Sequence, residues 1–350
     1  QLLDGEKVSK KTLLSALTAG IPSIVIGTHA LLEDKVSFRS LALVVVDEQH
    51  RFGVSQRAKL QEESFRSDDG RLESVPHFLA MTATPIPRTL SLACFGNLDI
   101  SLLNEMPKNR KPIITKVARN HADRTKIEDF IRQEIKKGRQ AFIIFPLVET
   151  SLALKDVKAA VAEHETLEKK IFPDLKIGLI HGKMKSQEKE AMMKAFQERA
   201  FDILVATSVV EVGIDIPNAS VIVIEEADRF GLSQLHQFRG RVGRGDHQSY
   251  CFLIPGEHAS LENARLEALE KSADGFHIAE TDLALRGPGS FFGTRQSGFP
   301  DVAMESLTNL KLISLARAEA EILLTSDPSL ERHPLLRQSL ARFTARVHME

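Results

Sequence analysis

The sequence predicts an α/β fold in which parallel sheets form two successive domains, followed by a helical C-terminal tail. Apolar runs such as residues 41–46 and 203–206 are continuous, as expected of parallel strands that are buried on both faces. Stretches with a helical pattern, such as residues 11–19, separate these runs and give a β/α alternation. At 350 residues, the chain is long enough for two such domains and a smaller C-terminal unit.

Composition and charge are those of an ordinary globular protein. Hydrophobic residues make up 43% of the sequence and charged residues 27%. No run of about 18 apolar residues and no signal peptide occurs, so a cytoplasmic protein without a membrane partner is expected. The formal net charge of −1 means that a nucleic-acid surface would have to be a local patch. Cys94 and Cys251 lie in apolar context and predict buried reduced thiols, not a disulfide or zinc site.

Three apolar runs in the first domain each end in polar residues of unusual type. In a parallel sheet, ligands bind beyond the carboxyl ends of the strands. The polar clusters are therefore expected to lie at one functional edge of the sheet. The runs cover residues 23–26, 41–46 and 78–81, and they lead into Gly27-Thr28-His29, Asp47-Glu48-Gln49-His50 and Thr82-Ala83-Thr84, respectively.

Asp47 and Glu48 directly follow a run that reads as a buried strand. An aspartate in that place can hold Mg²⁺ through water, and a neighbouring carboxylate can accept a proton from an attacking water. A lone aspartate after a strand more often caps the next helix, but the full Asp-Glu-Gln-His string together with Thr-Ala-Thr favours the functional interpretation. His29 and His50 have no Cys or His partner at metal-ligand spacing, so a hydrogen-bonding role is expected for both.

A second β/α domain of similar size is expected after a short linker. Residues 106–112 contain two prolines and three basic residues and predict a hinge between the domains. Helical stretches at residues 123–137 and 186–197 alternate with new apolar runs. The predicted strands, whose ends are again polar, are residues 140–145, 177–180, 203–206, 221–224 and 250–254.

An arginine- and glycine-rich run spans residues 237–245. Arg241 and Arg244 are three positions apart, so on a helical turn their guanidinium groups would leave the same face. Two guanidinium groups on one face suit a phosphate, because each can donate parallel hydrogen bonds to anionic oxygens. Taken alone, such a run is as often a solvated basic loop.

The motifs at the strand ends resemble those of superfamily 2 helicases. Asp47-Glu48-Gln49-His50 resembles the DExH form of motif II, and Thr82-Ala83-Thr84 resembles motif III. The longer strings at residues 47–54 and 81–90 are similar to the RecG branch of that superfamily, and residues 27–31, 206–217 and 234–244 resemble motifs Ib, V and VI. The resemblance covers nearly the whole chain and implies tandem RecA-like domains with parallel sheets, the first of them truncated.

This resemblance also implies the cofactors ATP and Mg²⁺ and the roles of individual residues. Asp47 would hold Mg²⁺ through water, Glu48 would be the catalytic carboxylate, and Arg241 and Arg244 would be arginine fingers for the γ-phosphate. Because the arginines would arrive only when the domains close, hydrolysis would be coupled to motion between domains. The resemblance further assigns Gln237, Gly213 and Asp215 to nucleotide binding, Thr28, His29 and Thr207 to the DNA backbone, and His50, Thr82, Thr84 and Glu211 to coupling.

The tail, residues 257–350, carries a further resemblance. Residues 278–289 and 292–298 resemble the translocation motif shared by RecG and the transcription-repair coupling factor Mfd, a helical hairpin and loop that move duplex DNA. Arg286, Thr294 and Arg295 would couple this loop to motif VI. The alternative is a surface helix capped by Gly287-Pro288. Helices are expected at residues 261–272, 306–324 and 335–343, and the Leu and Ala spacing of the second predicts a packing face.

The sequence contains no Gly-x-x-x-x-Gly-Lys-Ser/Thr phosphate loop. RecG proteins carry theirs upstream of the matching region, so the chain is expected to be a fragment that begins after it. The isolated chain would then bind ATP poorly and hydrolyse none. The expected domains are residues 1–105 and 106–256 for the two helicase lobes and 257–350 for the tail.

The leading hypothesis is therefore an ATP-dependent translocase on double-stranded DNA that remodels stalled replication forks and branched recombination intermediates in DNA repair. Its expected partners are forks and Holliday junctions, with single-strand-binding protein as a further candidate, and a monomer is expected. One alternative is the motor region of Mfd, against which Gln49-His50 argues. The other is a non-enzymatic DNA-binding or scaffold module.

Overall fold

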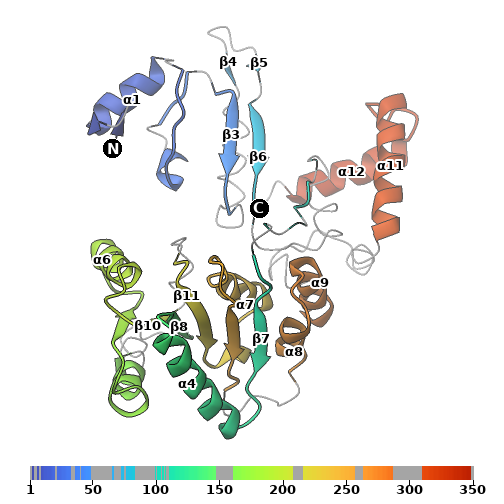
Figure 1. Cartoon of the computed structure of the whole chain (residues 1–350). Helices are drawn as coiled ribbons and strands as arrows, with labels where there is room; N and C mark the ends of the chain where they lie inside the picture. Colours follow the sequence, from blue (N-terminus) through green and yellow to red (C-terminus); the bar gives the residue numbers. More distant parts are fainter. Residues whose placement is uncertain are drawn as a thin grey trace. The chain divides into compact units, whose positions relative to one another are not determined.

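The chain folds into two compact units, Gln1–Ala83 and Thr84–Glu350, shown in Figure 1 as a computed structural model. The predicted domain bounds at residues 105 and 256 stay predictions. The structure describes residues 2–3, 6–7, 9–19, 22–32, 36–39, 41–48, 65–66, 72–74, 76–82, 99, 101–103, 105, 107, 110–146, 161–207, 216–256, 263–286 and 310–347. None of the helices in these ranges is both long and apolar enough to span a membrane.

The first unit is built around one parallel strand pair. Strands β3 (Leu43–Val46) and β6 (His77–Ala80) pair in register from Leu43 opposite His77 to Val46 opposite Ala80. Two short antiparallel pairs accompany them, β1 (Leu2–Leu3) with β2 (Glu6–Lys7) and β4 (Phe65–Arg66) with β5 (Leu72–Ser74). Helix α1 (Lys10–Thr18) confirms the predicted helix, and a 3₁₀ helix follows at His29–Leu32.

Two predictions for this unit are wrong. The strand predicted at residues 23–26 is absent, and Ile24 and Ile26 are each 92% exposed. A strand needs a hydrogen-bonding neighbour, and no pairing reaches this run within the described residues. Strand β3 is also buried on one face only, because Val44 and Val46 pack with Leu41 and Phe78 while the side chain of Val45 is 51% exposed.

The second unit contains a six-stranded parallel sheet with the spatial order β7-β12-β11-β8-β10-β9. All of its pairings are parallel, so the predicted β/α architecture is confirmed. The strand order reverses between β8 and β11, the position at which ligands bind in open α/β sheets. The strands are β7 (Ile114–Val117), β8 (Gln140–Phe145), β9 (Ile177–Ile180), β10 (Ile203–Thr207), β11 (Ala219–Ile224) and β12 (Tyr250–Leu253).

Helices cover both faces of this sheet, as expected for a continuous apolar strand pattern. Phe142 and Ile144 of β8 belong to one core cluster, with α6 (Ser186–Gln197), α7 (Leu232–Arg239), α8 (Ala264–Lys271) and α9 (Gly275–Arg286). Ala141 and Ile143 belong to the other, with α4 (His121–Lys136) and the helical segment at residues 161–171. Cys251 is buried with a free thiol, as predicted, whereas Cys94 lies outside the described residues.

Two helices, α11 (Leu310–Ser326) and α12 (Pro334–Val347), lie near the end of the chain and confirm the predicted helices there. Asp327 organises the turn between them, since its carboxylate accepts hydrogen bonds from the backbone nitrogens of Glu331 at 3.0 Å and Arg332 at 2.9 Å. Leu315 and Ile322 of α11 are 60% and 64% exposed. The packing predicted for this helix is therefore not present among the described residues.

Candidate functional site

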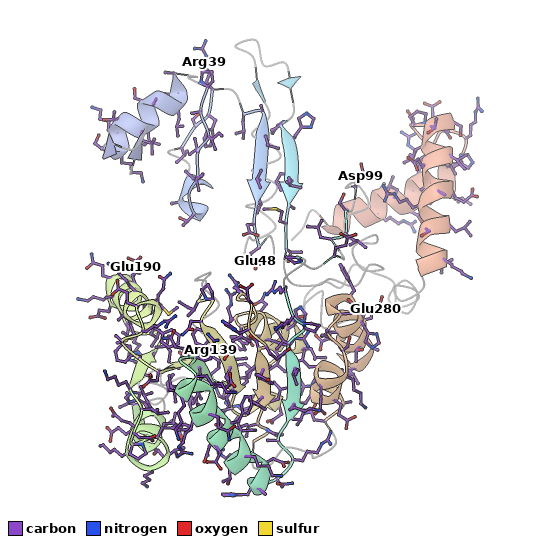
Figure 2. All side chains as sticks on the ribbon, in the orientation of Figure 1. Arg39, Glu48, Asp99, Arg139, Glu190 and Glu280 are labelled. Carbon is purple, nitrogen blue, oxygen red and sulfur yellow. The ribbon has the colours of Figure 1, made fainter. Side chains whose placement is uncertain are left out.

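The carboxyl edge of the β3–β6 pair brings motifs II and III together. Asp47 and Glu48 follow β3, and the backbone nitrogen of Met81 donates to the oxygen of Val46 at 2.7 Å, which sets Thr82 at the same edge. Figure 2 shows Glu48 at the end of β3. The predicted juxtaposition of these two motifs is thus present. Motif Ib does not lie at the end of a strand, because residues 22–27, directly before Thr28, form no strand.

Asp47 and Glu48 form a tight local arrangement. Glu48 has the left-handed backbone torsion φ 51°, which is uncommon outside glycine, and its nitrogen donates to Asp47 Oδ1 at 2.9 Å. Asp47 is exposed and Glu48 half-buried. Two carboxylates suit Mg²⁺, which takes one or two of them and keeps its waters. In the described part of the chain, no group of three or more His, Cys, Asp or Glu side chains could hold a metal ion.

The residues assigned to DNA contact differ in exposure. Thr28 is exposed, and its hydroxyl accepts from the nitrogen of Ala30 at 3.4 Å as the 3₁₀ helix begins. Thr207 ends β10 and is only 2% exposed, with no hydrogen-bond partner for its hydroxyl among the described residues. Both assignments stay predictions. The side chains of His29 and Arg286 and all of His50, Thr84, Glu211, Gly213, Asp215, Thr294 and Arg295 lie outside the described residues.

The arginine run leaves the end of helix α7. Leu232, Leu235 and Phe238 fix α7 in the core, each with no exposed surface. The helix ends at Arg239, so Arg241 and Arg244 do not lie on a helical turn as the spacing suggested. Gly243 stands between them with φ 78°, a left-handed torsion that favours glycine. Arg244 is exposed, whereas Gln237 and Arg241 are half-buried.

Close backbone approach fixes the loop that carries these arginines. A Cβ atom on Gly245 would come within 2.5 Å of the Pro217 carbonyl oxygen, so only glycine fits. Val242 is fully buried in the core between the two arginines. The loop of residues 240–245 therefore has a defined path even though Arg244 faces solvent.

Arg239 links helix α7 to the end of helix α8, a role that the sequence interpretation missed. The side chain is 5% exposed, and Nη1 donates to the carbonyl oxygens of Leu269 at 3.1 Å and Ser272 at 2.8 Å. Nη2 donates to the oxygen of Ala273 at 3.2 Å and contacts His236 Nδ1 at 3.0 Å. A cation among the last carbonyls of a helix is favourable. Its position four residues after Leu235, on the apolar stripe, is the signal that could have revealed its burial.

Burial sets the protonation of the groups around Arg239. Burial, followed by the neighbouring charge of Arg239, lowers the pKa of His236 to about 4 from 6.5. His236 is therefore neutral near pH 7 and can accept a hydrogen bond from the guanidinium group. Burial also raises the pKa of the Cys251 thiol to about 12, so this cysteine is an unreactive core residue.

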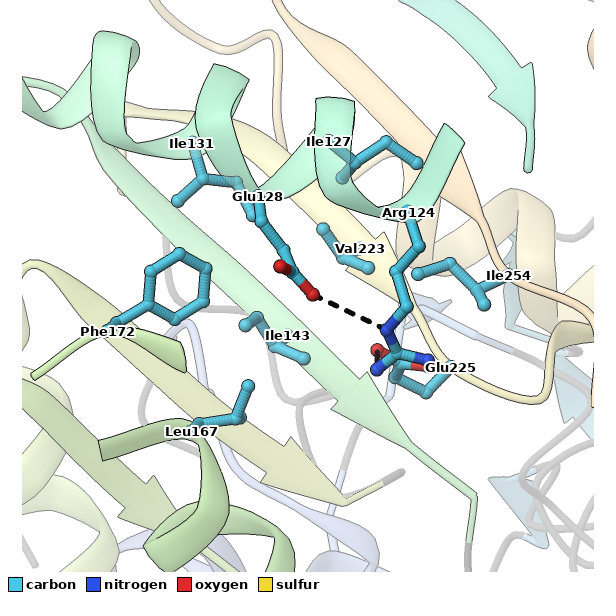
Figure 3. Close-up of a pocket in the computed structure, with 10 residues that line it drawn as sticks. All are labelled: Arg124, Ile127, Glu128, Ile131, Ile143, Leu167, Phe172, Val223, Glu225 and Ile254. Carbon is cyan, nitrogen blue, oxygen red and sulfur yellow. Dashed lines mark hydrogen bonds and ion pairs between the residues drawn. The ribbon is translucent and has the colours of Figure 1, made fainter. Parts of the chain in front are cut away.

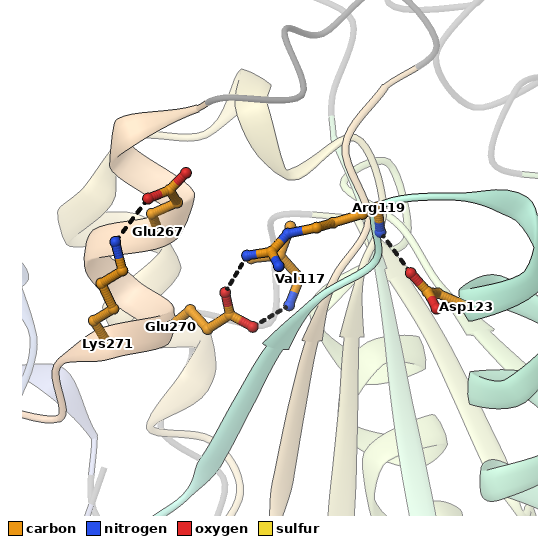
Figure 4. Close-up of polar contacts among 6 residues, drawn as sticks. All are labelled: Val117, Arg119, Asp123, Glu267, Glu270 and Lys271. Carbon is orange, nitrogen blue, oxygen red and sulfur yellow. Dashed lines mark hydrogen bonds and ion pairs between the residues drawn. The ribbon is translucent and has the colours of Figure 1, made fainter.

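Helix α8 is also attached to the edge strand of the sheet. Glu270 Oε1 accepts from the backbone nitrogen of Val117 in β7 at 3.2 Å, and Oε2 pairs with Arg119 Nη2 at 3.0 Å. Figure 4 shows this carboxylate lying between α8 and β7. Helix α8 is therefore bonded to the edge strand β7 through Glu270 and to helix α7 through Arg239.

A charged cluster around the buried side chain of Glu225 lies at the carboxyl end of β11. Arg124 of α4 pairs with Glu225 at 2.8 Å and with Glu128 at 3.5 Å, in a small pocket otherwise lined by apolar side chains (Figure 3). Burial raises the pKa of Glu225 to about 7, against the opposing attraction of Arg124. Desolvation thus outweighs the ion pair, so this carboxyl group titrates near neutral pH.

Comparisons with known proteins agree with these features. Residues 2–92 match the family model of the DEAD/DEAH box helicases, residues 124–246 that of the helicase conserved C-terminal domain, and residues 272–342 that of domain 3, C-terminal, of the ATP-dependent DNA helicase RecG. The last match favours RecG over the Mfd alternative.

Individual relatives carry the same family name. The RecG helicase of Synechocystis sp. is 51% identical over 98% of this chain and 40% of the relative, and that of Aquifex aeolicus is 46% identical over 95% and 42%. A structure of RecG bound to a three-way DNA junction matches with a TM-score of 0.63 and 42% identity, over 87% of this chain and 38% of that one. The chain thus spans about 40% of these relatives' length, and it belongs to the RecG family of ATP-dependent DNA helicases.

Proposed function

We propose that this chain is the motor part of an ATP-dependent translocase on double-stranded DNA that remodels stalled forks and branched recombination intermediates. The observation that carries the proposal is the position of the arginine loop, residues 240–245, directly after helix α7. Arg239 of α7 is bonded to the end of helix α8, which leads into the RecG domain 3 segment. One helix thus connects residues suited to a triphosphate with the part of the chain that distinguishes RecG. The structure of a relative bound to a three-way DNA junction supports branched DNA as the substrate.

The described side chains of each unit are of the kinds that ATP with Mg²⁺ requires, carboxylates in the first unit and guanidinium groups in the second. ATP would supply the phosphoanhydride bond whose hydrolysis drives the motor. Asp47 would hold Mg²⁺ through water, and Glu48 would accept the proton of the attacking water. Arg241 and Arg244 would neutralise charge that develops on the γ-phosphate. Gln237, with Gly213 and Asp215, would contact the nucleotide.

DNA contact and coupling form the remaining part of the proposal. Thr28, His29 and Thr207 would contact the DNA backbone. The side chains of His50, Thr82, Thr84, Glu211, Arg286, Thr294 and Arg295 would couple these contacts to hydrolysis. The motor would work as a monomer in the cytoplasm, with single-strand-binding protein as a candidate partner.

The decisive test is Arg244→Ala in the full-length protein, measured as DNA-stimulated ATP hydrolysis. Removing an arginine that stabilises the transition state is expected to lower kcat by about 10³-fold. The fold should be preserved, because Arg244 is exposed. Arg119→Ala is the matched control, since Arg119 is an arginine of the same unit that is 58% exposed and pairs with Glu270, outside the arginine loop.

An unchanged kcat in Arg244→Ala would reject the arginine-finger assignment. Absence of DNA-stimulated hydrolysis in the unmodified full-length protein would favour a non-enzymatic DNA-binding module instead.

A further inference from the structure

The arginine loop is bonded to the stretch of chain that leads into strand β7. Arg110 Nε donates to the carbonyl oxygen of Gly243 at 2.9 Å, and the two residues are 133 positions apart in the sequence. Gly243 is the residue between Arg241 and Arg244 that has the left-handed torsion. The contact therefore reaches the loop at the point where its backbone changes direction.

Two further contacts run alongside this bond. Gln248 Nε2 donates to the oxygen of Pro112 at 2.7 Å. A Cβ atom on Gly243 would come within 3.0 Å of Ile113 Cγ1, so Ile113 packs directly against the loop backbone. The nitrogen of Ile114 then donates to the oxygen of Ser249 at 3.0 Å, which leads into the β7–β12 pairing. Residues 110–114 thus lie along residues 243–249 before the sheet begins.

We propose that Arg110 is a positioning residue for the arginine pair, an inference that rests on the proposed function of Arg241 and Arg244. The carbonyl group of Gly243 belongs to the peptide bond that continues directly into Arg244. Holding this carbonyl fixes the direction in which the chain enters Arg244. At 2.9 Å, the bond from Arg110 to the Gly243 oxygen is shorter than the bond from Arg244 Nε to the Gly240 oxygen, at 3.5 Å.

The bond from Arg110 to Gly243 also connects the predicted hinge, residues 106–112, to the loop that carries Arg241 and Arg244. The predicted hinge at residues 106–112 is not free throughout, because its last residues are bonded to the loop. A change in the direction of the chain before Arg110 would therefore act on the Gly243 carbonyl through the Arg110 side chain. Arg110 thereby makes the placement of Arg244 depend on the linker.

A double-mutant cycle in the full-length protein separates positioning from mere stabilisation. Arg110→Ala is expected to lower kcat of DNA-stimulated ATP hydrolysis by about 10- to 100-fold, as small misplacements of catalytic groups do. The KM for ATP should change by less than about threefold, because the loss falls on the transition state. In an Arg244→Ala background, Arg110→Ala should have no additional effect on kcat, since the group that it positions is absent.

Two further variants control for charge and folding. Lys111→Ala removes the exposed neighbouring cation and should leave kcat unchanged. Arg110→Lys retains a donor that can reach the Gly243 oxygen and should recover part of the loss. A thermal melt of each variant identifies any that fail to fold, and the Lys variant then provides the test.

The proposal is overturned if Arg110→Ala matches Lys111→Ala in kcat, or if it lowers kcat equally in both backgrounds. These outcomes leave the proposed function intact, provided that Arg244→Ala alone lowers kcat as proposed. An active Arg244→Ala variant would instead reject the arginine assignment itself, and the role of Arg110 with it.

Discussion

The parallel strands of the two units have similar apolar sequences but different surroundings. Strand β3 of the first unit alternates between exposed and buried residues. Strands β10 and β11 of the second unit are buried at every position. Each of the latter has a hydrogen-bonded strand on both sides and helices over both faces. The described part of the first unit offers β3 one parallel partner, β6.

The difference shows that neighbours, and not the apolar run itself, decide how much of a strand is buried. Because burial contributes about 25 cal/mol per Å² of apolar surface, the stability of the described chain is concentrated in the second unit. The helices α8 and α9 share that stability, since Leu266, Leu269 and Ile278 belong to the same core cluster as β8. Substitutions in the two units should therefore lower the free energy of unfolding by very different amounts.

Arg239→Met tests whether helix α8 belongs to this stable second unit, and it should have the largest effect. The carbonyl oxygens of Leu269, Ser272 and Ala273 would lose their donor in a buried place. At about 1 to 3 kcal/mol for each such group, partly offset by removal of a buried charge, we expect a loss of about 4 kcal/mol. The free energy of unfolding from denaturant titration measures it.

Arg119→Met is the control, because Arg119 also bonds to α8 but is 58% exposed. An exposed ion pair contributes less than about 1 kcal/mol. Equal costs for Arg239→Met and Arg119→Met would show that α8 is a separate, weakly attached element.

The pH dependence of stability tests whether Glu225, at the carboxyl end of β11, is buried in solution. The pKa of Glu225 is raised from 4.5 to about 7 by burial, so the folded state favours the protonated carboxyl. This contribution to stability is fully present below pH 4.5 and is lost as the pH rises through 7. The shift corresponds to a loss of up to about 3 kcal/mol. Glu225→Gln removes the titration and keeps an acceptor for Arg124.

Wild type and Glu225→Gln should therefore be compared at pH 4.5 and pH 8 by denaturant unfolding. The wild type should lose about 3 kcal/mol more than the variant between these values. His236, whose pKa is lowered to about 4, acts in the opposite direction, because its stabilisation is lost as the pH falls through 6.5 towards 4. It is present in both proteins and cancels in the difference. Parallel pH curves would mean that Glu225 is solvated in solution.

Much of the second unit could be predicted from the sequence because its elements are set by local patterns. Strand β8 and helix α6 have the predicted bounds, residues 140–145 and 186–197. Hydrophobic periodicity carries that information directly. In the first unit the same reasoning gave β3 and β6 but predicted a strand at residues 23–26, where the apolar residues are exposed for want of a partner.

The residue types of the candidate site could be predicted from the sequence, but the contacts that hold these residues in place could not. The motifs identified Asp47, Glu48 and the arginine pair from strings of adjacent residues. The bond from Arg110 to Gly243 joins residues 133 positions apart, and no local pattern specifies such a pairing. Arg239 is an intermediate case, since its place on the helical stripe could have revealed its burial but not the carbonyl groups of α8 that it contacts.

A pair of valine substitutions tests the comparison between the units most directly and should have the smallest effects. Val205 in β10 has no exposed surface, whereas Val45 in β3 is 51% exposed. Val205→Ala removes buried methyl groups and leaves a cavity, at a cost of about 2 kcal/mol. Val45→Ala should cost less than about 0.5 kcal/mol, as surface substitutions do. Hydrogen exchange of the β3 and β10 amides assigns each loss to its own unit. Equal costs would mean that the exposed face of β3 is covered in solution, and the contrast between the two sheets would then reflect a missing neighbour of β3.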